Sequence, residues 1–249
     1  MATNSRIEWT EATWNPVAGC SIISPGCTNC YAMRMAARLE MMGQEKYSGL
    51  TRRSGGRPKW NGRVRLDENA LDIPRMWKTG RMIFVNSMSD LFHEDVPLEH
   101  VKRVFEIMEG CPQHTFQVLT KRSSRLLELS DRLDWPANVW MGVSVENSDF
   151  KFRIDHLRLT RAAMKFLSLE PLIGDVGSLA LSGINWAIAG GESGPGARPM
   201  RPEWVRSIRD QCIASSVAFH FKQWGGVNKK RAGRILDGRT WDQFPSIAA

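Results

Sequence analysis

The segment RMIFVNSMSDLFHEDVPLEHVKRVFEIMEGCPQHTFQVLTKRS (81–123) contains one complete unit of strand, helix and strand. The apolar run 82–86 is short and bounded by polar residues, as in a buried strand, and the run 115–120 has the same character. Between them, 97–110 opens with Pro and closes with Gly, the residues that favour a helix start and a helix stop. Four apolar residues fall on one face of that helix: Val101, Val104, Phe105 and Met108. The segment therefore predicts two parallel strands joined by a helix.

The same unit recurs along the chain. Further strand-like runs are 138–145, 164–169, 184–190 and 217–221, and helical patterns cover 123–133, 148–160 and 202–214. The runs begin about 20 to 35 residues apart, the spacing of repeated strand–helix units in a parallel sheet. A first strand around 13–17 brings the count to six or seven units, too few for a closed eightfold barrel. We expect an α/β fold with a partial, open barrel, and a doubly wound sheet is the alternative.

The length favours one domain over residues 1–249, with a basic insertion at 44–80 and a C-terminal extension at 222–249. The extension contains Asp237-Gly238, which predicts a hairpin turn. The insertion contains seven basic and no acidic residues between positions 46 and 65: Lys46, Arg52, Arg53, Arg57, Lys59, Arg63 and Arg65. Tyr47 and Trp60 are interleaved with them, and basic side chains with stacking aromatics are typical of a nucleic-acid groove.

The composition indicates a soluble protein that binds a polyanion. The net charge is +8 and the isoelectric point is about 9.5, which favours DNA, RNA or a nucleotide-like substrate. No apolar run approaches the length of a membrane span, and the first residues lack the pattern of a secretory signal. We expect a cytoplasmic protein without membrane contact. Five cysteines in a reducing compartment favour metal binding over disulfides.

Polar and charged residues follow each strand-like run, where a parallel fold places its chemistry. The charged members are Asp90, Lys121, Glu146, Glu170, Glu192 and Lys222. Six such junctions in succession predict an active site at the carboxyl ends of the strands.

Three cysteines, Cys20, Cys27 and Cys30, lie within one loop, which we call the cysteine loop (residues 20–30). Pro25-Gly26 predicts a turn that brings the first thiol back toward the other two. Cys30 stands at the expected start of a helix, where the dipole favours the thiolate. Three thiolates suit zinc or an iron–sulfur cluster, and His93 is the best fourth protein ligand for zinc. Cys111 and Cys212 are expected in the core.

Motifs in the same order along nearly the whole chain resemble the phage Gp37/Gp68 family (DUF5131). They are IEWTEATWNPVAGCSIISPGCTNCYAMRMA, FVNSMSDLFHEDVP, QVLTKR, VWMGVSVEN, LSLEPLIG, AGGESGPGARPM and LDGRTWDQFP. This family is in turn similar to radical S-adenosylmethionine enzymes, especially the spore photoproduct lyase-like group. The resemblance implies a partial (β/α)6 TIM-like barrel. The cysteine spacing C-x6-C-x2-C departs from the usual C-x3-C-x2-C of those enzymes.

The resemblance also implies cofactors and residue roles. A [4Fe–4S] cluster on Cys20, Cys27 and Cys30 would bind S-adenosylmethionine, and an electron donor protein would reduce it. Ser87, Ser89 and Asp90 stand where the methionine amino group is bound. Glu146 and Asn147 stand at the ribose, Gly190 and Gly191 at the adenine or ribose, and Glu192 supplies a polar contact. Lys121, Arg122, Arg198 and Lys222 remain as candidates for a substrate phosphate or carboxylate.

Three functional hypotheses follow. The first is a radical S-adenosylmethionine enzyme that generates a 5′-deoxyadenosyl radical to modify or repair a nucleic acid or nucleoside-like substrate. The second is a zinc-stabilised nucleic-acid-binding protein without catalysis. The third is a metal-dependent nuclease whose carboxylates are Asp90, Glu146, Glu170 and Glu192.

Overall fold

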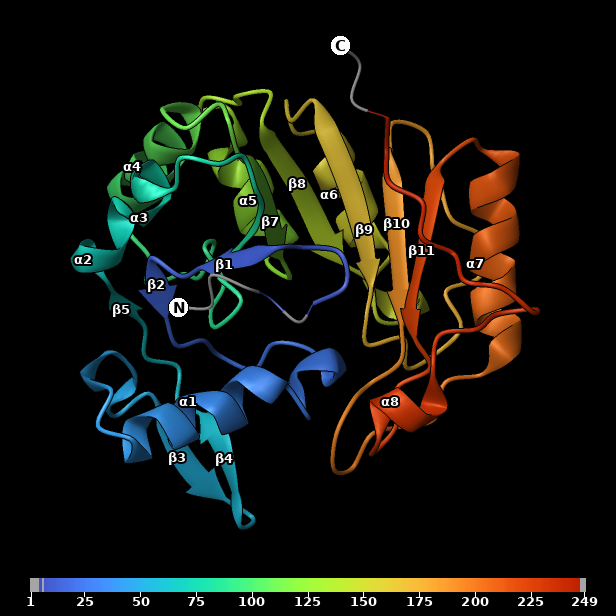
Figure 1. The fold of residues 1–249 in the computed structure, drawn as a ribbon, viewed down its shortest axis with the longest axis horizontal. Coiled ribbons are helices and arrows are strands. Elements are labelled where there is room, and N and C mark those ends of the chain that lie inside the picture. The colour runs from blue at the N-terminus through green and yellow to red at the C-terminus, as the bar shows by residue number, and fades with distance from the viewer. Residues whose placement is uncertain (1–4, 6, 247–249) are drawn as a thin grey trace.

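The computed structural model describes residue 5 and residues 7–246, and its main element is one sheet of seven parallel strands. The strands are β1 (Ala12–Trp14), β6 (Met82–Val85), β7 (Thr115–Thr120), β8 (Val139–Ser144), β9 (Met164–Leu169), β10 (Trp186–Gly190) and β11 (Ala218–Gln223). Their order in the sheet is their order in the sequence. The sheet curls into an open half-barrel with β1 and β11 at its edges (Figure 1).

The strand-like runs predicted from the sequence are confirmed, but the partial (β/α)6 TIM-like barrel is wrong. Seven strands form the open sheet, and strand–helix units do not alternate evenly along it. Residues 170–185, between β9 and β10, form no helix, and this segment contains Pro171, Gly174, Gly177 and Gly183. Proline and glycine at that density disfavour a helix. The connection from β1 to β6 also differs from a regular barrel unit, because it contains several helices and short strands where one helix is expected.

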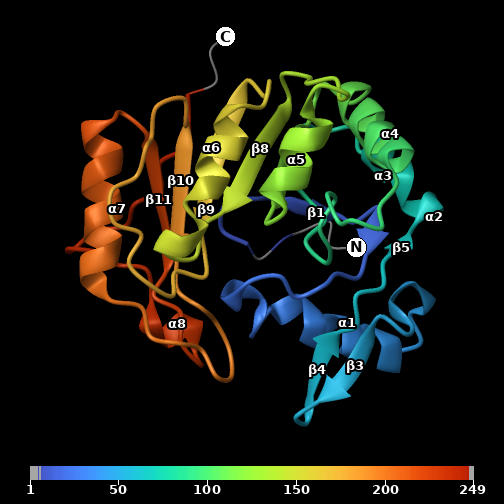
Figure 2. The ribbon, with the colours of Figure 1, turned by 180° about the vertical axis from the view of Figure 1, so that it is seen from behind.

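Four helices cover the convex face of the sheet: α4 (Leu98–Glu109), α5 (Ser123–Ser130), α6 (Phe152–Arg158) and α7 (Pro202–Ala214). Figure 2 shows α5 and α6 in front of the strands from this side. Alternate strand residues, such as Phe116 and Val118 of β7, pack against these helices in the largest hydrophobic core. The predicted helices are confirmed. The 148–160 pattern divides into η3 (Ser148–Phe150) and α6.

The concave face is filled by large aromatic side chains near the amino ends of the strands. Trp9, Trp140, Phe166 and Trp186 form this second cluster. Gly142 of β8 makes room for it, because a Cβ atom there would lie 2.4 Å from the Phe166 ring. The interior is therefore packed at this end, and polar groups are left for the carboxyl ends of the strands.

Part of the long connection between β1 and β6 forms a separate layer with its own small core, whereas Val17 and Leu71 of the same connection pack in the main core. The elements of this connection are β2 (Val17–Ala18), η1 (Pro25–Cys27), α1 (Tyr31–Met41), η2 (Glu45–Tyr47), β3 (Thr51–Ser54), β4 (Arg57–Trp60), β5 (Arg65–Leu66), α2 (Glu68–Leu71) and α3 (Ile73–Met76). The β3–β4 hairpin packs against α1, below the sheet in the view of Figure 1. Tyr47 and Trp60, predicted to stack on nucleic acid, are instead buried in the small core between α1 and the hairpin.

The C-terminal segment returns along β11. The predicted turn at Asp237-Gly238 is confirmed, since both residues have positive φ and Leu236 bridges to Arg239. The short helix α8 (Lys229–Ala232) precedes this turn. Residues 247–249 of the expected extension lie outside the described residues. Within the described part of the chain, no helix has the length and apolarity required to cross a membrane.

Candidate functional site

Charged residues from six different strand ends gather at the carboxyl edge of the sheet, and we call this region the strand-end rim. Its members are the six charged residues predicted from the sequence: Asp90, Lys121, Glu146, Glu170, Glu192 and Lys222. Each carboxylate among them has a lysine or arginine partner within 3.1 Å. The residues thus form ion pairs spread along the edge.

Glu146 is the most enclosed of these carboxylates, with a fully buried side chain. Its Oε1 accepts hydrogen bonds from Lys121 Nζ at 2.8 Å and Ser24 Oγ at 2.5 Å, and its Oε2 accepts one from Arg153 Nη1 at 2.7 Å. Burial alone would raise the pKa of Glu146, but Lys121 and Arg153 hold it below its ordinary value. Glu146 is therefore a buried anion that joins the cysteine loop, β7 and α6.

Asp90 lies beyond β6 and is also buried. Its carboxylate accepts four hydrogen bonds, from Thr120 Oγ1 at 2.7 Å, Arg122 Nη1 at 3.1 Å, and the backbone amides of Phe92 at 3.0 Å and Lys121 at 3.1 Å. These bonds fill the lone pairs that were expected to receive a ligand ammonium.

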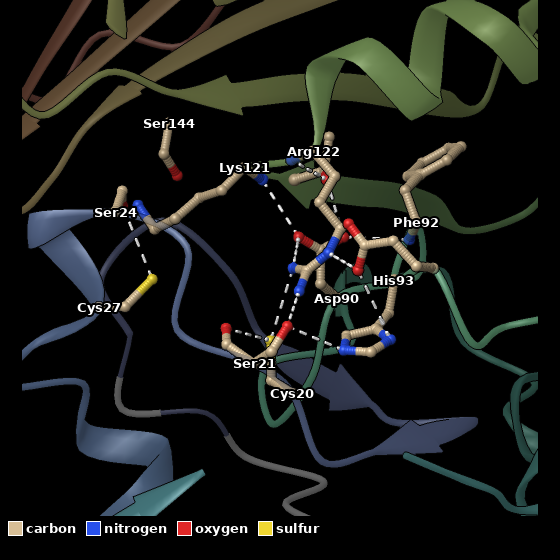
Figure 3. Close-up of polar contacts among 12 residues, drawn as sticks. Cys20, Ser21, Ser24, Cys27, Asp90, Phe92, His93, Lys121, Arg122 and Ser144 are labelled. Carbon is tan, nitrogen blue, oxygen red and sulfur yellow. Dashed lines mark hydrogen bonds and ion pairs between the residues drawn. The ribbon is translucent and has the colours of Figure 1, made fainter. Parts of the chain in front are cut away.

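Arg122 connects Asp90 to the cysteine loop (Figure 3). Its guanidinium donates to Ser21 Oγ at 2.5 Å, to Glu94 Oε2 at 2.9 Å and to Cys20 Sγ at 3.6 Å. The side chain is only 3% exposed. Arg122, predicted as a substrate-binding residue, holds the loop onto the sheet.

A second connection joins the loop after β10 to the cysteine loop. Glu192 accepts two bonds from the Arg198 guanidinium and one from Asn29 Nδ2 at 3.0 Å. Arg198 also donates to the carbonyl oxygen of Pro25 at 2.9 Å. Burial favours a higher pKa for Glu192, but the Arg198 bonds lower it below its ordinary value. Further along the rim, Lys222 Nζ lies 2.8 and 2.9 Å from the two carboxylate oxygens of Glu170.

The cysteine loop does not form the metal site predicted from its sequence. Cys20 contacts Arg122, whereas Cys27 lies 3.6 Å from Ser24 Oγ (Figure 3). Within residue 5 and residues 7–246, no three His, Cys, Asp or Glu side chains lie close enough together to hold a metal ion. The expected [4Fe–4S] cluster, and with it the binding of S-adenosylmethionine through that cluster, is therefore a wrong prediction.

The burial of the thiols also disfavours the thiolate form that a metal site would need. Burial raises the pKa of Cys20 to about 12, and it also raises the pKa of Cys30, although Cys30 stands directly before α1 as predicted. Desolvation thus outweighs the helix dipole that was expected to favour a thiolate.

His93, the expected fourth zinc ligand, uses both ring nitrogens within the protein. Nδ1 accepts from the amide of Asp95 at 3.1 Å, and Nε2 lies 3.0 Å from Ser21 Oγ. Burial and then the Arg122 charge lower the pKa of His93, so its ring is a neutral hydrogen-bonding group.

The remaining predicted site residues have local structural partners. Ser87 Oγ donates to Asn15 Oδ1, Ser89 Oγ donates to the carbonyl oxygen of Val17, and Asn147 caps η3. Gly190 ends β10 beside Glu170. At Gly191, a Cβ atom would lie 2.1 Å from the carbonyl oxygen of Trp224, so this glycine permits close backbone packing.

Sequence reasoning missed Arg153, Ser24 and Asn29. Arg153 had a detectable signal, because it falls on the apolar face of its helix with Ile154 and Leu157, where an arginine needs a buried anion. Ser24 and Asn29 had no such signal, since their partners Glu146 and Glu192 lie far away in the sequence.

These features define an α/β protein with an open parallel sheet, whose strand-end rim is covered by an N-terminal loop. The chain belongs to the family described as Protein of unknown function (DUF5131), which it matches over residues 4–245. No curated protein matches the chain, and no solved structure does.

Proposed function

We propose that the protein is an enzyme that acts on a nucleic acid or a nucleoside-like substrate at the strand-end rim. Parallel α/β folds place their reaction chemistry at the carboxyl ends of the strands. The rim contains two partly exposed amines, each paired with a carboxylate: Lys121, 20% exposed, with Glu146, and Lys222, 12% exposed, with Glu170. Such amines bind phosphate or carboxylate oxygens, and the paired carboxylates hold them in position.

One observation carries this proposal: the basic hairpin β3–β4 is continuous with the rim. Lys59 Nζ donates to the carbonyl oxygen of Thr28 in the cysteine loop at 2.6 Å. On the other side, a Cβ atom on Gly196 would lie 3.1 Å from Arg57 Nη1. The positive charge of the insertion therefore lies directly beside the loops that cover the rim, where it favours a polyanionic substrate.

A distant relationship to radical S-adenosylmethionine enzymes stays a sequence-based hypothesis. It is supported by the three-cysteine loop that precedes a helix at the carboxyl edge of a parallel sheet. Because the described thiols form no ligand group, the proposed activity involves no cluster, S-adenosylmethionine or zinc. It is defined by the substrate class and by the place of the reaction.

The proposal is tested by comparing the nucleosides of cells that produce the wild-type protein with those of cells that produce Lys121→Met. We expect at least one nucleoside of digested DNA or RNA to change in abundance with the wild type and not with the variant. Lys102→Met on the convex helix α4 removes an exposed lysine in the same way and should behave as wild type.

Photocrosslinking of a 4-thiouridine oligonucleotide locates the substrate independently. Crosslinked peptides from the cysteine loop or from residues 190–200 are expected. Crosslinking there without any change in nucleosides would support non-catalytic nucleic-acid binding instead. The absence of both results would refute the proposal.

A further inference from the structure

One face of the β3–β4 hairpin carries three cations. Arg52 pairs with Lys59 across the hairpin, and Arg57 lies two residues before Lys59 on the same strand. Because side chains alternate between the two faces of a strand, these three residues share one face. The opposite face carries Trp60, which is buried against α1. The cationic face is therefore the one turned away from the small core.

The helix α1 meets the hairpin cations at the loop after β10, because Arg34 lies beside Gly194 and Arg57 lies beside Gly196. Tyr31, Arg34, Met35 and Arg38 follow the i, i+3, i+4, i+7 spacing of one helix face, whereas Ala32, Met33 and Ala36 are buried against the hairpin. Tyr31 is 47% exposed and Met35 40%. The Tyr31 hydroxyl donates to the carbonyl oxygen of Ser87 at 2.7 Å, which fixes the ring while leaving much of it open to solvent.

Four cations of this surface are available for an external anion, whereas Lys59 Nζ already donates one hydrogen bond to the carbonyl oxygen of Thr28. Within the part of the chain that the structure describes, the side chains of Arg34, Arg38, Arg52 and Arg57 make no hydrogen bond or ion pair. Other cations of the insertion are already engaged, since Lys46 pairs with Asp67 and Arg65 donates to the carbonyl oxygens of Glu45 and Ser48. The sequence stretch 46–65 thus contributes to binding only in part, and α1 adds arginines that lie outside it.

We propose that this surface, formed by Arg34 and Arg38 of α1 with Arg52, Arg57 and Lys59 of the hairpin, binds the phosphodiester backbone of a single-stranded nucleic acid. Tyr31 provides the stacking face for one base at the edge of the rim. The inference rests on the proposed function and adds the form of the substrate and the path by which it enters.

One observation favours a single strand over a duplex, and a second indicates the path of the strand. The surface alternates cations with an exposed aromatic ring and Met35, and an unpaired base stacks on an aromatic ring whereas a paired base does not expose its face. Arg34 also lies at the loop after β10, because a Cβ atom on Gly194 would be 2.5 Å from its Nη2. The strand is therefore guided from the hairpin toward Glu192 and the rest of the rim.

The test is fluorescence anisotropy of the full chain with a fluorescein-labelled oligothymidylate of roughly 20 nucleotides, longer than a site of about 4–16 nucleotides. Arg52→Gln/Arg57→Gln is compared with Arg132→Gln/Arg161→Gln, which removes the same charge from exposed arginines near the amino ends of the strands. The hairpin pair should bind more weakly, and its slope of log affinity against log salt should be shallower by about 1.4, at about 0.7 per lost phosphate contact. The control pair should keep the wild-type slope.

Tyr31→Leu separates stacking from charge. It should weaken oligothymidylate binding by about fivefold to hundredfold while leaving the salt slope unchanged. A blunt duplex of the same length should bind more weakly than the single strand and should not respond to Tyr31→Leu.

The inference is overturned if the hairpin and control pairs lose the same affinity, if the slope does not change, or if the duplex binds more tightly. None of these results decides the proposed function, which the nucleoside comparison and the crosslinks test separately. A wild-type protein that binds no oligothymidylate while nucleosides change in cells would refute the surface alone.

Discussion

The buried carboxylate of Glu146 provides the sharpest test of how the rim is held together. Glu146→Gln keeps the shape of the side chain but replaces one oxygen by an amide nitrogen. In wild type, Lys121 and Ser24 donate to one oxygen and Arg153 to the other, so the new amide group faces a donor on either side. Either orientation leaves a buried cation, above all Arg153 at 3% exposure, without its anion.

Breaking a buried ion pair from one side costs about 3–5 kcal/mol, a large part of a typical stability of about 5–15 kcal/mol. For a urea dependence near 3 kcal/mol per molar, the unfolding midpoint should fall by about 1–2 M. Urea unfolding followed by tryptophan fluorescence measures this directly. Glu99→Gln makes the same change in the exposed pair with Lys102 and should leave the midpoint unaltered.

A second variant shows whether the unpaired cation is the cause. Adding Arg153→Met to Glu146→Gln removes the buried charge and should recover part of the lost stability. If Glu146→Gln shifts the midpoint no more than Glu99→Gln does, or if Arg153→Met brings no recovery, then Glu146 is not the buried anion described here.

Three further changes test separate parts of the fold. Gly191→Ala places a methyl group 2.1 Å from the carbonyl oxygen of Trp224 and should destabilise the protein by about 1–3 kcal/mol, as read by thermal unfolding. Burial lowers the pKa of His220 to about 4, so the unfolded chain binds a proton at this residue more readily than the folded protein does. The free energy of unfolding of the wild type should therefore fall by about 3 kcal/mol as pH drops from 6.5 to 4. His220→Phe should remove this loss in urea titrations across the same range. Arg122→Lys cannot reproduce the guanidinium bonds to the cysteine loop. If the loop loses about 2 kcal/mol of local stability, alkylation of Cys20 should accelerate about 30-fold. An unchanged alkylation rate would refute the role of Arg122.

Patterns of short range predicted much of the architecture. The apolar runs located the strands, the Pro and Gly boundaries located α4, and Pro202 located the start of α7, because periodicity and capping act within a few residues. The convergence of Asp90, Lys121 and Glu146 followed from one geometric rule, that the carboxyl ends of parallel strands meet at one edge.

Two of the failures share a physical cause, because each depends on packing against other parts of the chain. The thiol of Cys30 was expected to ionise at a helix start, but desolvation by the surrounding chain dominates its pKa. The sequence predicted that Tyr47 and Trp60 stack on nucleic acid, but in the structure both side chains are buried against α1. The segment between β9 and β10 is different, because its proline and glycines are visible in the sequence and they disfavour the helix that a (β/α)6 barrel would need there.

The match between strand order and sequence order has a consequence for the assembly of the protein during synthesis. Each strand after β6 can join a neighbour that has already been made, so the sheet grows in the direction in which the chain leaves the ribosome. The cysteine loop cannot reach its final contacts in the order of synthesis. It is synthesised early, but the hydrogen bonds of Ser24 with Glu146 and of Pro25 with Arg198 can form only after those later residues have been made. The rim is therefore completed only after most of the chain has emerged, and a protein truncated before β10 would hold a sheet without a finished site.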